Sequence, residues 1–96
     1  MLRARYGADV GLVAGGTIRG DRTFGPGELT VQDLVTMFPF EETCTVLALS
    51  GAQLLAALEN GFSRYPAMDG RFPQISGVRV SVDPSLPPGG RICSCI

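Results

Sequence analysis

At residues 45–62 the chain reads TVLALSGAQLLAALENGF, which predicts a strand followed directly by a helix. Residues 45–49 have the length and the β-branched and aliphatic content of a strand. Ser50 can cap the helix that follows, and Gln53, three residues on, completes a capping-box pattern. Apolar side chains then recur at helical spacing, at Leu54, Leu55, Leu58 and Phe62. We expect this face to pack in the core, because such stripes pack far more often than they bind ligands.

Toward the amino end, the sequence predicts two further helices with a strand between them. Residues 1–6 read as a helix that ends at Gly7, and residues 10–13 as a short buried strand. Thr30 opens a second helix with its own capping-box pattern. That helix should end before Pro39, because the residue preceding a proline is pushed out of helical geometry.

Toward the carboxyl end, strands are predicted to replace helices. Residues 63–74 read as a polar loop, and residues 78–82 alternate like a half-buried strand. Residues 84–90 contain three prolines and predict a turn, after which another strand begins at Arg91. This order of elements predicts an α+β domain over residues 1–96, with a mixed sheet flanked by helices; an α/β arrangement is the alternative.

Composition narrows the classes of function that this chain can have. Its 96 residues fit one small domain, with 45% hydrophobic and 18% charged residues and a net charge of −1. Eight basic and nine acidic residues give no excess of positive charge of the kind that nucleic-acid-binding proteins carry, so no binding to nucleic acid is predicted. No apolar run approaches the roughly 18–20 residues needed to cross a bilayer, so no membrane span is predicted.

Residue types that usually carry hydrolytic chemistry are scarce. The chain has no histidine and only nine acidic residues, which are scattered along it. Hydrolytic metal sites and nucleophile–base pairs commonly use imidazole. Three cysteines, Cys44, Cys93 and Cys95, do not form the framework of a disulfide scaffold. We therefore predict no catalytic residue, no metal site and no cofactor site in this chain.

A glycine-rich segment that contains Gly15, Gly16 and Arg19 is the first candidate for binding. A glycine pair after a buried strand lets backbone amides approach a ligand closely. An arginine just beyond can pair with an anion or stack on a ring. The alternative is a tight turn with a surface arginine. The segment is not a P-loop, because it lacks the Gly-Lys-Ser/Thr ending.

Phe40 is the second candidate for binding, in the run Phe38-Pro39-Phe40. A loop phenylalanine made rigid by a neighbouring proline offers a platform on which a flat aromatic base can stack. The alternative is that both phenylalanines cap the core.

Short motifs in a fixed order run through nearly the whole chain. They are Ala8-Asp9-Val10, Gly15-Gly16-Thr17-Ile18-Arg19, Gly27-Glu28-Leu29-Thr30, Asp33-Leu34, Pro39-Phe40, Leu49-Ser50-Gly51-Ala52-Gln53-Leu54, Leu58-Glu59-Asn60-Gly61, Phe72-Pro73-Gln74-Ile75-Ser76-Gly77, Asp83-Pro84-Ser85 and Pro88-Gly89-Gly90-Arg91. Together they resemble the C-terminal domain of the 5'-nucleotidase family.

The resemblance implies a division of labour between two domains. In this family an N-terminal calcineurin-like domain holds two divalent metal ions, of the zinc or manganese type, and hydrolyses a phosphate monoester. The C-terminal domain binds the nucleoside part of a nucleotide or related ester. By resemblance, Arg19 contacts the substrate from the segment that contains Gly15 and Gly16, and Phe40 forms one side of an aromatic clamp on the base. The family is often extracellular or periplasmic, and this chain shows no signal for any compartment.

Two departures from the family pattern qualify this reading. The family usually has asparagine where this chain has Ala14, so a polar contact to the ligand is lost. The chain also lacks the family's Asn-Gly-Gly-Asp-Gly-Phe-like loop and its Gly-Asn-Leu-like motif, so we expect a domain incomplete at both ends. A stand-alone binding or interaction module and a non-functional gene fragment are the alternative interpretations.

Overall fold

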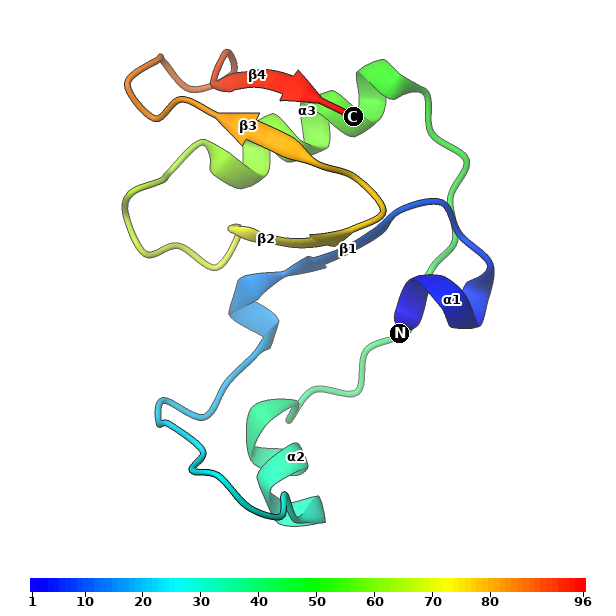
Figure 1. Ribbon diagram of the computed structural model, residues 1–96, viewed down its shortest axis with the longest axis vertical. Helices are drawn as coiled ribbons and strands as arrows, with labels where there is room; N and C mark the ends of the chain where they lie inside the picture. The colour runs from blue at the N-terminus through cyan, green and yellow to red at the C-terminus, as the bar shows by residue number, and fades with distance from the viewer.

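The computed structural model describes all of residues 1–96 and has three α-helices, one 3-10 turn and four short strands (Figure 1). The helices are α1 (Leu2–Tyr6), α2 (Val31–Met37) and α3 (Gly51–Phe62), and the 3-10 turn is η1 (Gly15–Thr17). The strands are β1 (Gly11–Ala14), β2 (Pro73–Ser76), β3 (Val80–Val82) and β4 (Ile92–Cys95). The predicted α+β class is confirmed. None of the helices has the length and apolar character required to cross a membrane.

The strands pair as two separate two-stranded antiparallel sheets, where the sequence predicted one mixed sheet. In the first, β1 pairs with β2, and Leu12 lies opposite Ile75. In the second, β3 pairs with β4, with an irregularity in register between Ser81 and Val82. The strand β2 begins inside the predicted loop 63–74. It starts with Pro73, which a strand tolerates at its first residue, and it is too short to show a clear alternation in the sequence.

The predicted strand at residues 45–49 is wrong. This segment is extended, but none of its backbone groups makes a hydrogen bond within the chain. A strand needs a neighbouring strand to accept and donate its hydrogen bonds, and β1 pairs only with β2. Val46 and Leu47 therefore remain 59% and 68% exposed.

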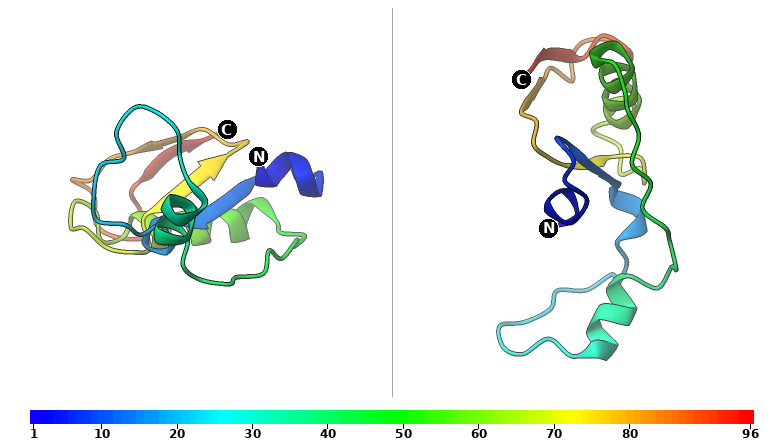
Figure 2. Two further views of the ribbon diagram at one scale, coloured as in Figure 1. Left: turned by 90° about the horizontal axis from the view of Figure 1, so that it is seen from below. Right: turned by 90° about the vertical axis from the view of Figure 1, so that its right-hand side faces the viewer.

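The core lies where α3 packs against β2 and β4. Leu58 is fully buried and Phe62 nearly so, which confirms two positions of the predicted helical face; Leu55 is exposed. Gly61 lets the strand come close, because a Cβ there would lie 3.0 Å from Cγ of Pro73. Figure 2 shows that α2 stands well away from this core.

Side chains at the end of α3 fasten the last strand to it. The buried Glu59 carboxylate accepts hydrogen bonds from the backbone N–H groups of Arg91 at 3.0 Å and Ile92 at 2.7 Å. In return, Nη1 of Arg91 donates to the carbonyl oxygens of Phe62, Ser63 and Tyr65. A cation is favourable there, because the carbonyl end of a helix carries partial negative charge.

Both predicted capping boxes are present. Oγ1 of Thr30 accepts from the N–H of Asp33, whose carboxylate accepts from the N–H of Thr30. Ser50 and Gln53 exchange the equivalent bonds at the start of α3. Gly7 ends α1 with a φ of 61°, the left-handed conformation that favours glycine.

Candidate functional site

The glycine-rich segment follows β1 as the 3-10 turn η1 and lies against residues 69–72. The Gly15 N–H donates to the carbonyl of Phe72 at 2.8 Å, and the Gly16 N–H donates to the carbonyl of Gly70 at 2.9 Å. A Cβ on Gly16 would lie 2.7 Å from Cα of Gly70, so the two backbones meet too closely for a side chain. Both amides are thus engaged inside the protein, and neither is a free donor for a ligand.

The structure brings Arg19 and Phe40 together. The Arg19 N–H donates to the carbonyl of Met37 at 2.7 Å, which ties the segment after η1 to the end of α2. From there the Arg19 guanidinium carbon lies 5.2 Å from the centre of the Phe40 ring. This is the geometry of a cation–π contact. Phe40 keeps 51% of its surface exposed, so the contact leaves much of the ring accessible.

A second arginine–phenylalanine pair lies nearby, with a different electrostatic environment. The Arg22 guanidinium carbon lies 4.4 Å from the centre of the Phe24 ring, and its Nη2 pairs with the Asp33 carboxylate at 3.0 Å. The hydrogen bond from the Thr30 backbone N–H is the largest cause of the lowered pKa of Asp33, and the Arg22 charge adds to it. Arg19, by contrast, has no carboxylate partner, so its charge is available to a ligand.

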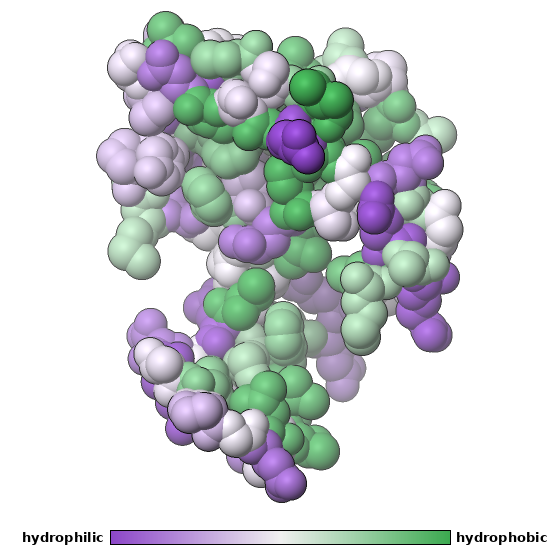
Figure 3. Space-filling view, viewed as in Figure 1, coloured by the Kyte–Doolittle hydropathy of each residue, from purple (hydrophilic) through white to green (hydrophobic).

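An open groove of about 540 Å³ adjoins Phe40. It lies between β1, α1 and the unpaired residues 42–47, and twelve of its eighteen lining residues are hydrophobic. Its lining includes Ala14 and Thr17, which flank the glycine pair, and also Phe38 and Phe40. Apolar side chains also gather over α2 below it, as Figure 3 shows. The Arg19–Phe40 pair is therefore a cationic and aromatic feature at the edge of a largely apolar surface.

The turn at residues 69–72 was not selected from the sequence, although it contacts the glycine-rich segment directly. The Asp69 carboxylate accepts from both the backbone N–H and Nε of Arg71, each at 3.0 Å. The backbone hydrogen bond is the largest cause of the lowered pKa of Asp69. The Asp69-Gly70 dipeptide is a turn signal in the sequence, but no local pattern reveals which segment that turn contacts.

The residues present do not fit a metal ion. No group of three or more carboxylate, thiol or imidazole side chains lies close enough together to hold one. Cys44, Cys93 and Cys95 are free and exposed.

Comparison with known proteins places this geometry in a family. Residues 1–96 match the model of the 5'-nucleotidase C-terminal domain along their whole length. The chain belongs to this family. Over 98% of its length it superposes, with a TM-score of 0.88 and 37% identity, on part of the crystal structure of the 5'-nucleotidase precursor from Thermus thermophilus.

Curated relatives of this 5'-nucleotidase C-terminal domain agree. It is 34% identical to the snake venom 5'-nucleotidase of Macrovipera lebetinus over 86% of the chain. It is 33% identical to the trifunctional nucleotide phosphoesterase protein YfkN of Bacillus subtilis over 90% of the chain. The matched regions are 21% and 6% of those proteins, and 18% of the Thermus thermophilus chain. The chain thus spans about a fifth or less of the length of these relatives.

Proposed function

We propose that this domain is the substrate-recognition part of a metal-dependent 5'-nucleotidase, with Arg19 and Phe40 as its contacts to the substrate. One observation carries the proposal: the Arg19 guanidinium lies over the Phe40 ring at the edge of an open groove, although 20 residues separate the two in the sequence. Family membership and the names of the relatives supply the class of ligand, a nucleotide or related phosphate ester.

The two side chains suit a nucleoside for different physical reasons. The exposed ring surface of Phe40 offers a stacking face, and every nucleobase has a flat face to match. The Arg19 guanidinium can stack on a ring or donate hydrogen bonds to phosphate and hydroxyl oxygens. Because no carboxylate neutralises it, Arg19 can turn toward a ligand without breaking an ion pair.

Gly15 and Gly16 contribute to binding by placement. Their amides hold η1 against residues 69–72, and Arg19 follows η1 after one intervening residue. In this proposal the glycines fix the start of the segment that presents Arg19, and the Met37 carbonyl fixes its end.

Hydrolysis is assigned to an N-terminal metallophosphatase domain of the same protein. When bound there, two divalent metal ions would supply the Lewis-acid chemistry of phosphate-ester cleavage. Within this chain no three acidic or cysteine side chains lie close enough together to hold such an ion. Its task is to hold the nucleoside part of the ester that the other domain cleaves.

Steady-state kinetics of the complete protein that contains this domain test the proposal. Phe40→Ala should raise the KM for AMP by roughly 10-fold, since base–aromatic stacking contributes about 1–3 kcal/mol. Arg19→Ala should raise it by roughly the same factor, since a hydrogen bond to a charged group contributes about 1.5–3 kcal/mol. The kcat for p-nitrophenyl phosphate, which has no nucleoside, should stay unchanged.

The second arginine–phenylalanine pair supplies matched controls. Arg22→Ala and Phe24→Ala remove the same kinds of side chain from a pair whose ring does not line the groove, whereas Phe40 does. They should leave the KM for AMP within about twofold of wild type, as expected for substitutions away from a binding site. An equal loss of turnover on p-nitrophenyl phosphate in the Arg19 and Phe40 variants would contradict a recognition role.

A further inference from the structure

The turn at residues 69–72 is held by hydrogen bonds among its own residues. The Phe72 N–H donates to the Asp69 carbonyl at 3.2 Å, which closes the turn. The Asp69 carboxylate also accepts from the backbone N–H and the Nε of Arg71. Arg71 is therefore held in one orientation by the turn to which it belongs.

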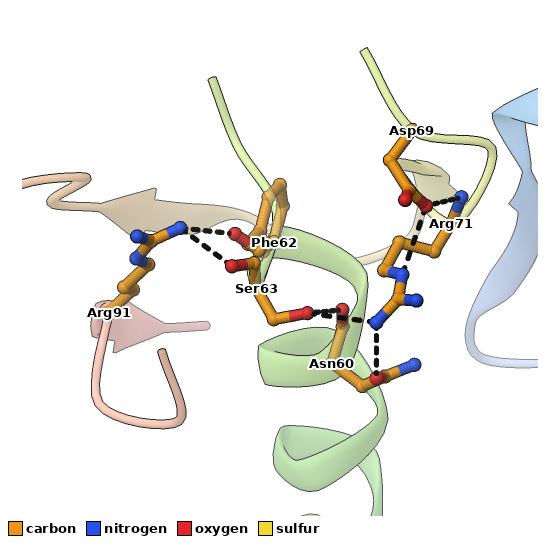
Figure 4. Close-up of polar contacts among 6 residues, drawn as sticks. All are labelled: Asn60, Phe62, Ser63, Asp69, Arg71 and Arg91. Atoms are coloured by element: carbon orange, nitrogen blue, oxygen red, sulfur yellow. Dashed lines mark hydrogen bonds and ion pairs between the residues drawn. The ribbon is translucent and has the colours of Figure 1, made fainter. Parts of the chain in front are cut away.

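Arg71 then ties this turn to the end of α3. Its Nη1 donates to Oδ1 of Asn60 at 3.4 Å and to Oγ of Ser63 at 3.3 Å (Figure 4). Ser63 in turn donates to the Asn60 carbonyl at 2.6 Å, so both acceptors belong to the same hydrogen-bonded end of α3. Figure 4 shows the guanidinium lying between the turn and α3.

The opposite side of the same turn contacts the glycine-rich segment. The Gly70 carbonyl accepts from the Gly16 N–H, and the Phe72 carbonyl accepts from the Gly15 N–H. The two ends of this contact are anchored differently. Phe72 packs on Phe62, with ring centres 5.4 Å apart. Gly70 has no side chain, so its position depends on the contacts of Asp69 and Arg71.

We propose that Arg71 is a positioning residue for substrate recognition: through Gly70 it places η1, and thereby Arg19, relative to the Phe40 ring. The proposal rests on the proposed function for its ligand, a nucleotide. A contiguous series of contacts supports it, from Asn60 and Ser63 through Arg71, Gly70 and Gly16 to the segment that ends at Arg19.

The contacts of the Arg71 guanidinium position the turn but contribute little to the stability of the fold. The Arg71 side chain is 38% exposed, and exposed ion pairs contribute little to stability. The pairing of β1 with β2 and the packing of Phe72 on Phe62 do not use the guanidinium. Removing it should leave the fold intact and free mainly the Gly70 end of the turn.

The test uses Arg71→Met in the complete protein, because methionine keeps an unbranched side chain and removes every side-chain donor, while the backbone N–H that donates to Asp69 remains. We expect the melting temperature to fall by no more than about 4 °C. Amide hydrogen exchange should accelerate at Gly16, because its acceptor, the Gly70 carbonyl, is no longer held in place. Exchange at Gly15 should change much less, because its acceptor, the Phe72 carbonyl, belongs to a residue that packs on Phe62. The KM for AMP should rise about fivefold, with kcat on p-nitrophenyl phosphate unchanged, because small displacements of a binding group weaken recognition.

Two further variants keep the test decisive. Arg79→Met is the control, and it should change none of these readouts. The Arg79 backbone pairs with that of Ile96, and the Arg79 side chain takes no part in the hydrogen bonds of the turn. Asp69→Asn removes the carboxylate that orients Arg71, and it should shift exchange at Gly16 and the KM in the same direction by a smaller factor. It serves as the test if Arg71→Met does not fold.

Each result has a defined meaning. Unchanged exchange at Gly16, or faster exchange with an unchanged KM for AMP, overturns the positioning role while Arg19→Ala still raises that KM. If Arg19→Ala and Phe40→Ala leave the KM unchanged, the proposed function fails, and the positioning role fails with it.

Discussion

Glu59→Ala should be among the most destabilising single changes in this domain. Glu59 is a buried charged residue, and its two carboxylate oxygens accept from consecutive backbone N–H groups, those of Arg91 and Ile92. Alanine leaves both donors without their partner at the point where β4 begins. Unsatisfied buried donors cost more than the bond itself contributes, because their desolvation is no longer offset.

The size of the effect follows from the two bonds. Hydrogen bonds to a charged group contribute about 1.5–3 kcal/mol each. The bond from Ile92, at 2.7 Å, has the length of a charge-assisted bond, and the bond from Arg91, at 3.0 Å, has an ordinary length. Water can reach part of this strand end, so we expect a loss of about 3 kcal/mol in the free energy of unfolding. That is a large fraction of the roughly 5–14 kcal/mol expected for a domain of this size.

Urea-induced unfolding of the complete protein measures this loss, with amide hydrogen exchange in β4 as the probe of unfolding. Glu59→Gln keeps one acceptor oxygen and should lose about half as much. Glu28→Ala is the matched control, because Glu28 is exposed and makes no hydrogen bond, and it should stay within about 0.5 kcal/mol of wild type. A loss below about 1 kcal/mol for Glu59→Ala would refute the reasoning, since it would mean that water replaces the carboxylate.

Two further substitutions test the glycine-rich segment and the α2 cap. Gly16→Ala forces the new Cβ against Gly70, so we expect the free energy of unfolding to fall by about 1–3 kcal/mol and the KM for AMP to rise. Gly25→Ala is the control, because a Cβ there meets nothing within 4 Å, and it should change neither quantity. Equal effects of the two substitutions would contradict the close approach of Gly16 to Gly70. The pKa of Asp33 is lowered from its ordinary value of 3.8, mainly by the Thr30 N–H. The stabilisation by its carboxylate is therefore complete above about pH 4 and is lost as the pH falls through the lowered pKa. Unfolding of wild type and Asp33→Asn across acidic pH checks this, and parallel curves would argue against it.

Features that depend on neighbours in sequence were predictable. Both capping boxes, the helix end at Gly7 and the burial of Leu58 and Phe62 follow from spacing within one or two helical turns. The strand at residues 80–82 and its partner from residue 92 were also anticipated, because alternation and a proline-rich turn mark them locally.

The candidate site was predictable only in part. Local residue types and the motif resemblance both singled out Arg19 and Phe40, but neither spacing nor composition indicates that they meet. The expectation for Gly15 and Gly16 concerned amides facing a ligand, whereas these amides bond to residues 69–72. The sequence does not indicate which carbonyl a backbone N–H will bond to. The contact of the Gly15 and Gly16 amides with residues 69–72, and the role proposed for Arg71, therefore emerge only from the structure.

The sequence alone determined the α+β class, the end of α1, the capped starts of α2 and α3 and the absence of histidine, because these depend on residue type and on contacts a few positions apart. Tertiary structure decided which segments became strands. Residues 73–76 pair with β1 across some 60 positions despite a weak local pattern, while residues 45–49, with a stronger pattern, remain unpaired. The reason is that a strand is stabilised by hydrogen bonds to another strand, and only the three-dimensional arrangement determines whether one lies beside it.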